Sequence, residues 1–344
     1  MDGLVFIGNS KAEIRDFEVP APGPTEVLIR IRASGLCGSD FHTYDTEEGL
    51  RGPDGAFIAA GHEPAGEVEE VGELVTGFSP GDRVSAHHLL GCGYCRSCLM
   101  GYPVSCSSSA RAAYGGHRNG GHAEYLLAES RSLIHLPDNV SFIDGAMVAC
   151  GFSTAFSACR KATITAGDFV LVAGLGPVGL SVAMIASSLG AIVMGVDIDR
   201  ARAEKSREFG IVHTVSSSAE ADAVEEVNHF TGGHRVDVAI DCTGSDAARH
   251  LCLEAAAVWG RVVFIGFGGG DLSVNVAELF IMKQLTVKGS WVSSMAESSE
   301  AVRLISRLNL HPDRMVTATY GLREGVAAYK AFKKGAPGKL AIVS

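Results

Sequence analysis

Four cysteines in one short segment, GCGYCRSCLMGYPVSC, have the residue type and the spacing of a metal site. They are Cys92, Cys95, Cys98 and Cys106, spaced C-x2-C-x2-C-x7-C, a pattern that is rare by chance. Four thiolates on one loop can surround a single Zn²⁺ tetrahedrally and leave no coordination position for a substrate. The spacing therefore predicts a structural zinc site rather than a catalytic one.

Three further residues have the types expected of an open zinc site. Cys37 follows a predicted strand, His62 lies in the segment GHEP, and Cys150 comes at the end of the predicted first domain. Two thiolates and one imidazole leave a fourth position for water or substrate, which is the ligand set of a catalytic zinc. Each of these residues taken alone is more often a buried core residue. The set is therefore a hypothesis that needs support from the rest of the chain.

A glycine-rich turn at residues 174–179, GLGPVG, matches G-x-G-x-x-G between a strand-like apolar run and a helix-like one. The first glycine permits the tight turn, the second lets the backbone approach a pyrophosphate, and the third lets helix and strand pack closely. The N-terminus of the helix then faces the phosphates. The predicted cofactor contacts in this turn are Gly174, Gly176, Pro177, Val178 and Gly179.

An acidic residue, Asp197, ends the next predicted strand. It follows the turn at about the 20-residue separation expected for an acid that binds the ribose hydroxyls of the adenosine. Because a carboxylate there would repel a 2′-phosphate, we predict NAD rather than NADP. Arg200 and Arg202 follow directly and could instead accommodate that phosphate, and Arg202 is kept among the predicted cofactor contacts.

The composition is that of a globular chain of 344 residues, 47% hydrophobic and 20% charged, long enough for two domains. A formal net charge of −10 without a basic cluster argues against binding to nucleic acid or to anionic membranes. The N-terminal segment lacks a basic region followed by a long apolar run, so we expect no signal peptide. Nine cysteines in such a chain favour metal ligation over disulfides, and we expect a cytoplasmic protein.

The pattern of secondary structure changes near residue 150. Residues 1–150 read as short β-strands joined by Gly/Pro turns. Residues 151–294 alternate apolar strands with helices, which is typical of a doubly wound parallel sheet. Residues 295–344 end in GKLAIVS, a short strand predicted to return to the first domain. The predicted fold class is α/β, with a β-rich first domain.

Seven segments together resemble one family, the zinc-dependent medium-chain alcohol/polyol dehydrogenases. The segments are CGSDFH, GHE, GDRV, the four-cysteine loop, HAEY, GLGPVG and VDID, and they span essentially the whole chain. The resemblance implies a GroES-like catalytic domain at 1–150 with both zinc sites and a Rossmann NAD-binding domain at 151–294. The segment 295–344 then returns to the catalytic domain.

The resemblance also implies ligands for the catalytic metal. Cys37, His62 and Cys150 match the family's catalytic zinc ligands. Asp40 looks like the carboxylate that accepts a hydrogen bond from His62 and orients its ring. The implied cofactors are two Zn²⁺ per chain, one catalytic and one structural, together with NAD.

Other residues match the family's catalytic and cofactor contacts. Ser39 and His42 match its proton relay, and Glu63 matches an acid that can approach the metal during ligand exchange. Liver-type members have a basic cofactor contact near their C-terminal end, for which Lys339 is the candidate here.

The implied activity is oxidation of a secondary alcohol or polyol to a carbonyl, with hydride transfer to NAD, and the reverse reduction. The substrate class stays open. Polyol and threonine dehydrogenases often have a carboxylate where this chain has Cys150, whereas CGSDFHTY and the compact length resemble that branch. If the extra histidines face the pocket, they favour a polyol, cyclitol or sugar alcohol, since buried polar groups need partners. These histidines are His87, His88, His117 and His122.

Three other functions remain as alternatives. The first is dehydrogenation of a simple alcohol or of a threonine-like hydroxy amino acid. The second is a zinc-free quinone or enoyl reductase, against which the presence of Cys37, His62 and Cys150 argues. The third is a non-catalytic NAD-binding protein, which would have no use for the relay of Ser39 and His42.

We expect a small-molecule substrate and a homodimer or homotetramer. Chains of this length in the family are commonly tetramers, and residues 262–292 could extend a sheet across a two-fold axis.

Overall fold

A computed structural model describes residues 1–216, 220–335 and 338–344 of the chain. The chain divides into two compact units, which are Met1–Ser153 with Ser294–Ser344, and Thr154–Ser293. The domain limits that we propose from the sequence, 150 and 294, lie within a few residues of the bounds of these units.

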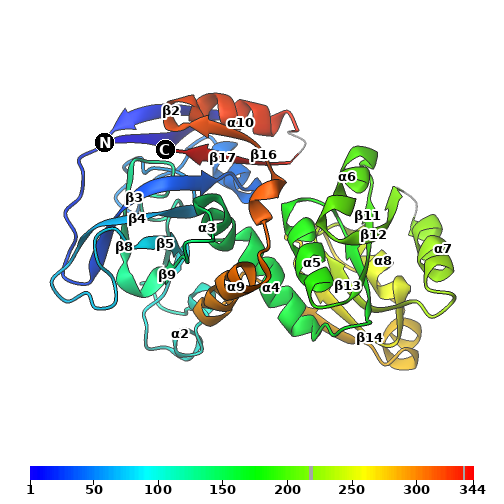
Figure 1. Ribbon diagram of the computed structural model, residues 1–344. Helices are drawn as coiled ribbons and strands as arrows, with labels where there is room; N and C mark the ends of the chain where they lie inside the picture. The colour runs from blue at the N-terminus through cyan, green and yellow to red at the C-terminus, as the bar shows by residue number, and fades with distance from the viewer. Residues whose placement is uncertain (217–219, 336–337) are drawn as a thin grey trace. The chain divides into compact units, whose positions relative to one another are not determined.

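A seven-stranded sheet forms the core of the first unit, shown with its strands labelled in Figure 1. Its spatial order is β16 (Val316–Gly321), β17 (Lys339–Val343), β3 (Glu26–Gly35), β4 (Pro64–Val71), β5 (Arg83–Ala86) and β9 (Leu133–His135), with β8 (Tyr125–Glu129) also paired to β3. The hairpin β1 (Asp2–Gly8) and β2 (Lys11–Asp16) and the short pair β6 (Leu89–Leu90) and β7 (Ala112–Ala113) complete the described strands of this unit. Apart from β16 and β17, neighbouring strands of the large sheet are antiparallel. Short antiparallel strands joined by loops leave room at the strand ends for the residues that could bind metal.

Short helices connect these strands. Side chains cap the two helices that flank the second unit in sequence, because Ser141 accepts the N–H of Asp144 and Ser294 accepts the N–H of Glu297. The α-helices are α1 (Phe41–Tyr44), α2 (Arg96–Leu99), α3 (Phe142–Val148), α9 (Met295–Leu308) and α10 (Gly325–Lys333). The 3₁₀ turns are η1 (Gly38–Asp40), η2 (Pro103–Ser105), η3 (Ser130–Ser132), η6 (Pro312–Met315) and η7 (Leu322–Glu324).

A six-stranded parallel sheet forms the core of the second unit. Its spatial order is β12 (Ile211–Ser216), β11 (Ile192–Asp197), β10 (Phe169–Ala173), β13 (Val236–Asp241), β14 (Ala256–Phe264) and β15 (Thr286–Gly289). The central strand β10 is an apolar run buried on both faces, as parallel strands covered by helices are. The strand order reverses between β10 and β13, and ligands of such sheets bind at the carboxyl ends of the strands at this point.

Helices cover both faces of this sheet (Figure 1). Val172 of β10 faces α5 (Pro177–Ser188), whereas Leu171 belongs to the core beneath α7 (Glu220–Phe230) and α8 (Asp246–Ala255). This alternation follows from the two-residue period of a strand. The remaining helical elements are α4 (Gly151–Ala162), which contains the boundary between the units, α6 (Arg200–Lys205), η4 (Ser206–Phe209) and the π-helical turn η5 (Ala277–Met282).

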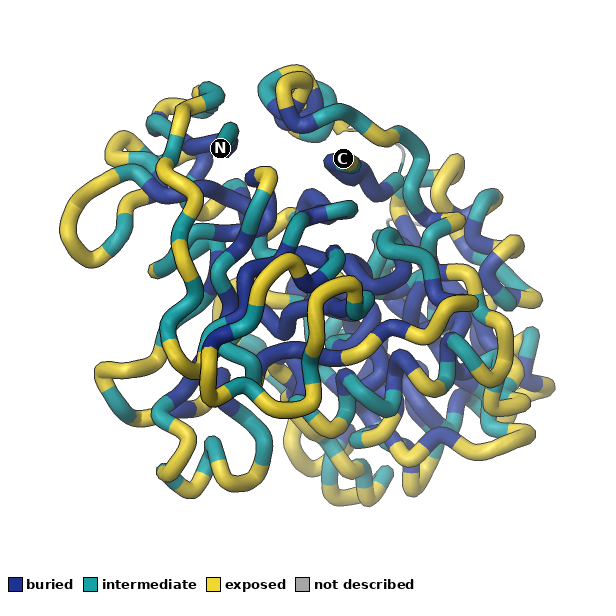
Figure 2. The backbone as a smooth tube through the Cα atoms, turned by 60° about the vertical axis from the view of Figure 1, so that its left-hand side comes forward, coloured by how far each residue is buried: buried dark blue, intermediate teal, exposed yellow. Residues whose placement is uncertain are grey.

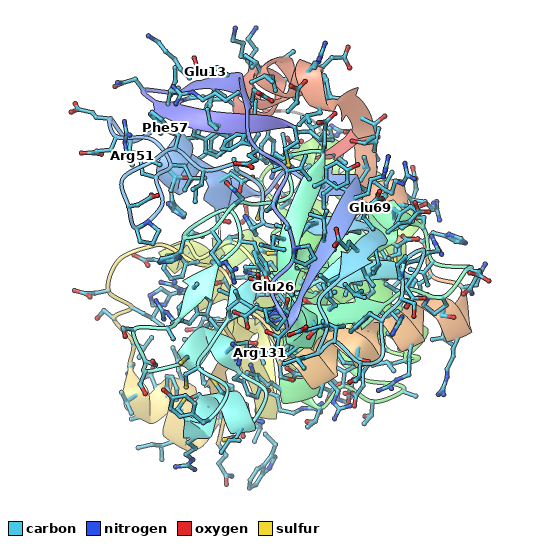
Figure 3. The ribbon with its side chains drawn as sticks, turned by 90° about the vertical axis from the view of Figure 1, so that its left-hand side faces the viewer. Glu13, Glu26, Arg51, Phe57, Glu69 and Arg131 are labelled. Atoms are coloured by element: carbon cyan, nitrogen blue, oxygen red, sulfur yellow. The ribbon has the colours of Figure 1, made fainter. Side chains whose placement is uncertain are left out.

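The strand residues are mostly buried, whereas charged side chains make contacts at the surface. The central strands β3 and β10 are mostly buried, and in Figure 2 the exposed stretches of the tube lie mostly in its outer loops and turns. On the first unit the Arg51 guanidinium lies 3.8 Å from the centroid of the Phe57 ring (Figure 3), Glu26 at the start of β3 is ion-paired with Arg118, and Arg131 is ion-paired with Glu129. Exposed contacts of this kind contribute little to stability, so the sheet cores hold the metal and cofactor segments in place.

Within the described residues, no single helix is long and apolar enough to cross a membrane. Helices α3 and α4 taken together pass on length and composition alone, with a bend of 53° between them.

Candidate functional site

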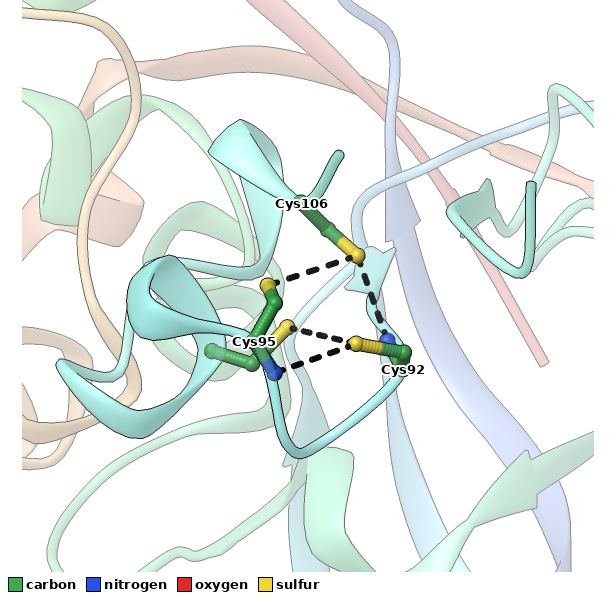
Figure 4. A group of neighbouring side chains, drawn as sticks. Cys92, Cys95 and Cys106 are labelled. Carbon is green, nitrogen blue, oxygen red and sulfur yellow. Dashed lines mark hydrogen bonds between the residues drawn. The ribbon is translucent and has the colours of Figure 1, made fainter. Parts of the chain in front are cut away.

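The four predicted zinc cysteines converge in the loop between β6 and β7. Figure 4 shows their sulfur atoms facing one another, with Cys92 Sγ 4.0 Å from Cys98 Sγ and Cys95 Sγ 3.9 Å from Cys106 Sγ. Four sulfurs bound tetrahedrally at a Zn–S distance of about 2.3 Å lie about 3.8 Å apart. The observed separations therefore fit one zinc ion at the centre of the loop.

Backbone donors favour the thiolate form that a metal needs. The N–H of Cys95 points at Cys92 Sγ at 3.3 Å, and the N–H of Cys92 points at Cys106 Sγ at 3.3 Å. Backbone hydrogen bonding, first from Cys98, lowers the pKa of Cys95 to about 6. Burial raises the pKa of Cys98 to about 12, and the neighbouring sulfurs add to this. All four sulfurs can thus be thiolates together only when a cation balances their charge.

A second cluster gathers Cys37, His62, Glu63 and Cys150, whose possible ligand atoms all lie within 4.8 Å of one another. Cys37 follows β3, His62 and Glu63 precede β4, and Cys150 follows α3. The three predicted catalytic zinc ligands are thus brought together from segments far apart in the sequence, and the predicted acid Glu63 lies with them.

The imidazole of His62 is oriented for metal binding. Its Nδ1 lies 2.9 Å from Asp40 Oδ1, so the ring donates from Nδ1 and keeps the lone pair of Nε2 for a ligand bond. The N–H of Cys37 donates to Asp40 Oδ2 at 2.9 Å. The predicted support of His62 by Asp40 is therefore present, and the same carboxylate also holds the backbone of Cys37.

The charges of this cluster fit a divalent cation. A hydrogen bond from Cys150, together with the charge of His62, holds the pKa of Cys37 well below its usual range although burial opposes this. The same hydrogen bond, with burial, raises the pKa of Cys150 well above its usual range. Without a metal, Cys150 therefore keeps its proton beside the Cys37 thiolate. Zn²⁺ replaces such protons when it binds thiols.

Glu63 and Lys339 form a buried ion pair beside the ligands. Lys339 Nζ lies 2.6 Å from both carboxylate oxygens, but only Oε1 has hydrogen-bond geometry, and Oε2 is buried without a hydrogen-bond partner among the described residues. Burial raises the pKa of Glu63 to about 7 against the opposing charge of Lys339. Glu63 Oε2 is thus ion-paired with Lys339 without a hydrogen bond, and a carboxylate oxygen of Glu63 lies within 4.8 Å of the possible ligand atoms of Cys37, His62 and Cys150. Lys339, the candidate basic cofactor contact, instead places its ammonium on this carboxylate.

The glycine-rich turn between β10 and α5 has the shape of a phosphate site. Gly174 has a φ of +91°, which disfavours other residues, and a Cβ on Gly179 would lie 1.9 Å from Gly174 O. A Cβ on Gly176 would meet nothing within 4 Å, so open space adjoins the turn. No side chain caps α5, whose first residues are Pro177 and Val178, so its N-terminus can receive a phosphate.

Asp197 ends β11 beside this turn. Its Oδ2 accepts the N–H of Leu175 at 2.8 Å and its Oδ1 accepts the N–H of Asp199 at 2.8 Å. Each oxygen keeps a lone pair for a ribose hydroxyl. An Arg202 nitrogen lies 3.7 Å from Oδ2, so a positive and a negative group both face the place expected for the ribose.

Comparison with known proteins identifies the family. Residues 23–138 match the alcohol dehydrogenase GroES-like domain and residues 177–307 match the zinc-binding dehydrogenase domain. The uncharacterized zinc-type alcohol dehydrogenase-like protein YphC of Escherichia coli (strain K12) is 38% identical, over 97% of this chain and 96% of its own. The chain belongs to the zinc-dependent medium-chain alcohol/polyol dehydrogenases.

Two further comparisons agree with this dehydrogenase family. The sorbitol dehydrogenase of Halalkalibacterium halodurans is 33% identical over 95% of this chain and 94% of its own. The alcohol dehydrogenase TADH from Thermus sp. ATN1 has a TM-score of 0.91 at 26% identity, over 100% of this chain and 99% of the other. The predicted fold, a GroES-like domain plus a Rossmann doubly wound parallel sheet, is confirmed. The dehydrogenase acts on the CH–OH group of a small-molecule alcohol and uses zinc and a nicotinamide cofactor.

Of the two residues predicted to form a proton relay, Ser39 lies beside the second cluster and His42 follows Ser39 by three residues in the chain. Ser39 Oγ is exposed, 3.4 Å from His62 Nε2 and 3.3 Å from Cys37 Sγ. A hydroxyl at this place can exchange a proton with a group bound beside Nε2. His42 is exposed on α1, one turn further along the chain.

Buried polar residues around the cluster were only partly anticipated. His88 donates from Nδ1 to Ala149 O at 2.8 Å, and its ring centroid lies 5.1 Å from that of His62. His87 and His122 are also buried, whereas His117 is exposed. The sequence predicts His88 as one of four histidines that could face the substrate. No pattern in the sequence points to Tyr329, which donates a hydrogen bond to Asp40.

We expect Cys98→Ser to lower the zinc content from about two ions to about one per chain. The thermal midpoint should fall by roughly 10 °C, because loss of a structural metal is among the few changes that cost about 4 kcal/mol or more. Metal analysis and thermal unfolding measure both effects. Ser97→Ala, on the same turn, is the matched control and should change neither. Unaltered zinc content and midpoint in Cys98→Ser would contradict the structural role.

Proposed function

We propose that this chain oxidises a secondary alcohol or polyol to a carbonyl with NAD as the hydride acceptor, and catalyses the reverse reduction. Cys37, His62 and Cys150 are the proposed catalytic zinc ligands, and the four-cysteine loop is the proposed second zinc site. The observation that carries the proposal is the open set of three ligand atoms with Ser39 Oγ 3.4 Å from His62 Nε2. Three protein ligands leave one position free, which distinguishes catalytic from structural zinc.

The residues of the site divide the proposed work. When bound, zinc supplies Lewis acidity that favours loss of the substrate's hydroxyl proton, and the nicotinamide accepts the hydride. Ser39 Oγ accepts that proton and gives up its own, and the exposed His42 releases it to solvent. Glu63 Oε2 is the proposed reserve oxygen that can approach the metal while ligands exchange.

Support for NAD comes from Asp197. Its buried carboxylate would repel a 2′-phosphate, and its remaining lone pairs suit two ribose hydroxyls. Arg202 is half-exposed and also lies 3.5 Å from Asp199 Oδ2, so part of its charge is already balanced. We therefore favour NAD over NADP. Backbone contacts from Gly174, Gly176, Pro177, Val178 and Gly179 are proposed for the pyrophosphate.

Support for a polyol comes from His88 and from a relative. The buried imidazole of His88 donates from Nδ1 to Ala149 O, and its ring centroid lies 5.1 Å from that of His62, so it adds a polar side chain next to the proposed zinc ligand. Such a polar wall suits a second substrate hydroxyl better than an alkyl group. The relative named sorbitol dehydrogenase, at 33% identity, supports the same class. Sugar alcohols and cyclitols are therefore the substrates we favour over simple alcohols and threonine.

The test is NADH formation by the zinc-loaded protein with sugar alcohols, cyclitols, diols, simple alcohols and threonine. We expect turnover with a polyol, at least about tenfold higher kcat/KM with NAD than with NADP, and loss of activity when a chelator removes the catalytic zinc. Tighter or faster use of NADP would contradict the role of Asp197. NAD binding without turnover on any alcohol would support a non-catalytic role instead.

We expect Ser39→Ala to lower kcat by about 100-fold or more, because general acid–base catalysis contributes about 10²–10⁴-fold. His42→Ala should lower it less, since water can replace an exposed group. Steady-state kinetics over pH measure both. Ser39→Thr keeps the hydroxyl and is the matched control, so it should retain most activity. Equal activity in Ser39→Ala and the unaltered protein would remove Ser39 from the relay.

We also propose a homo-oligomer whose interface lies on the second unit. Strand β15 is the last strand of its sheet in the described part of the chain, so its outer edge can pair with a second copy. Beside it are exposed apolar side chains, which usually mark an interaction surface. They are Val258, Trp259, Ile281 and Met282. The free thiols and proposed thiolate ligands are consistent with the cytoplasm, which keeps thiols reduced.

Replacing Ile281 and Met282 together by Asp should convert the oligomer to monomer at micromolar concentration, because burying two carboxylates at an interface is unfavourable. Light scattering coupled to size exclusion measures the mass. Leu74→Asp, at an exposed apolar residue of the first unit, is the control and should leave the mass unchanged. An unchanged mass in the double variant would place the interface elsewhere.

A further inference from the structure

A line of buried hydrogen bonds continues outward from the proposed catalytic ligand His62. His62 Nδ1 lies 2.9 Å from Asp40 Oδ1, Tyr329 Oη lies 2.6 Å from Asp40 Oδ2, and His122 Nε2 lies 2.8 Å from Tyr329 Oη. Asp40, His122 and Tyr329 are each at most 5% exposed. A hydrogen bond made away from water is stronger and leaves little freedom to the groups that share it. Four side chains are therefore held in one fixed series.

The direction of each hydrogen bond follows from the number of protons available. His62 must keep Nε2 free for a metal, so its proton is on Nδ1 and goes to Asp40. An ionised carboxylate only accepts, so Tyr329 uses its single hydroxyl proton on Asp40. The contact between Tyr329 and His122 must then be donated by His122 Nε2–H. The series runs in one sense, from His122 through Tyr329 to Asp40.

Packing fixes the hydroxyl of Tyr329 independently of the metal ligands. Its ring meets Phe6 edge-on at a centroid distance of 4.8 Å and lies 5.3 Å from the ring of Tyr44. Tyr329 belongs to α10, which lies beside β2 and β17 (Figure 1). A phenylalanine would fill the same apolar place, so packing alone does not explain why this residue carries a hydroxyl. The hydrogen-bond partners of that hydroxyl in the described residues are Asp40 and His122.

We propose that Tyr329 is a positioning residue for the metal site: its hydroxyl, oriented by His122, fixes the carboxylate of Asp40 and through it the imidazole of His62. Asp40 accepts three donors, from His62, from Tyr329 and from the backbone of Cys37, and so ties two proposed ligands to α10. Loss of one donor frees Asp40 to rotate, and the orientation of His62 loosens. This proposal rests on the proposed function only in taking Cys37, His62 and Cys150 as ligands of one metal.

The test compares Tyr329→Phe with Tyr44→Phe. Both remove one hydroxyl from the same aromatic cluster, but no hydrogen bond joins Tyr44 to Asp40 among the contacts described, so it is the matched control. We expect Tyr329→Phe to lose its catalytic metal to a chelator about 10-fold faster, the lower end of the effect of groups that support a metal-bound histidine. The structural zinc should be retained, and the thermal midpoints of the two variants should agree.

A spectroscopic readout separates positioning from simple destabilisation. With Co²⁺ in place of the catalytic zinc, the visible absorption bands report ligand geometry. We expect them to shift in Tyr329→Phe and not in Tyr44→Phe. His122→Leu should resemble Tyr329→Phe, whereas His122→Gln, which can still donate to Tyr329, should restore the unaltered spectrum. In steady-state kinetics the effect of Tyr329→Phe should fall on kcat rather than on KM.

Identical chelation rates and cobalt spectra in Tyr329→Phe and Tyr44→Phe would overturn the positioning role and leave the proposed function intact. Absence of alcohol oxidation by the unaltered protein would overturn the proposed function, while the cobalt spectra and chelation rates would still decide the role of Tyr329. Equal loss of metal from the proposed catalytic site and from the four-cysteine loop in Tyr329→Phe would also overturn the proposal, because it would indicate general unfolding.

Discussion

Burial of several ionisable groups in one small volume is the constraint on which the first unit depends. Two thiols, an imidazole and a carboxyl group place their ligand atoms within 4.8 Å of one another, and Glu63 is fully buried. Like charges in so small a space repel strongly, and isolated buried charges are costly. Two contacts lower this electrostatic cost: Lys339 pairs with Glu63, and Asp40 accepts a hydrogen bond from His62. A divalent cation at this proposed site would complete the balance, since it would let Cys37 and Cys150 both ionise.

The sheet of the first unit delivers these groups to one place. Register pairs Ser34 of β3 with Pro64 of β4 and Gly35 with Ala341 of β17. Cys37 therefore leaves β3 where His62 and Glu63 enter β4, and Lys339 begins β17 beside them. A shift of one residue in this register would turn every side chain to the other face. The metal site and the strand pairing are thus mutually dependent, and α10 adds a further hold through its contact with Asp40.

The sequence predicted the local parts of this arrangement better than the distant ones. The spacing of the four cysteines and the G-x-G-x-x-G turn are short-range patterns, so the residue types and their spacing are enough to predict their geometry. The assignment of Cys37, His62 and Cys150 as proposed zinc ligands depended on resemblance to a family, since no local spacing joins them. The ion pair of Lys339 with Glu63 spans 276 residues and the contact of Tyr329 with Asp40 spans 289. Such contacts depend on strand order and helix docking, and no pattern in the sequence predicts them.

Crystallography at the zinc absorption edge would test the central claim most directly. The account predicts two anomalous peaks per chain, one within the four-cysteine loop and one bonded to Cys37 Sγ, His62 Nε2 and Cys150 Sγ. It also predicts that Glu63 stays paired with Lys339 when the fourth position holds a small ligand. A peak in the four-cysteine loop alone, in protein purified with excess zinc, would contradict the account, because the charges around His62 would then be balanced without a metal.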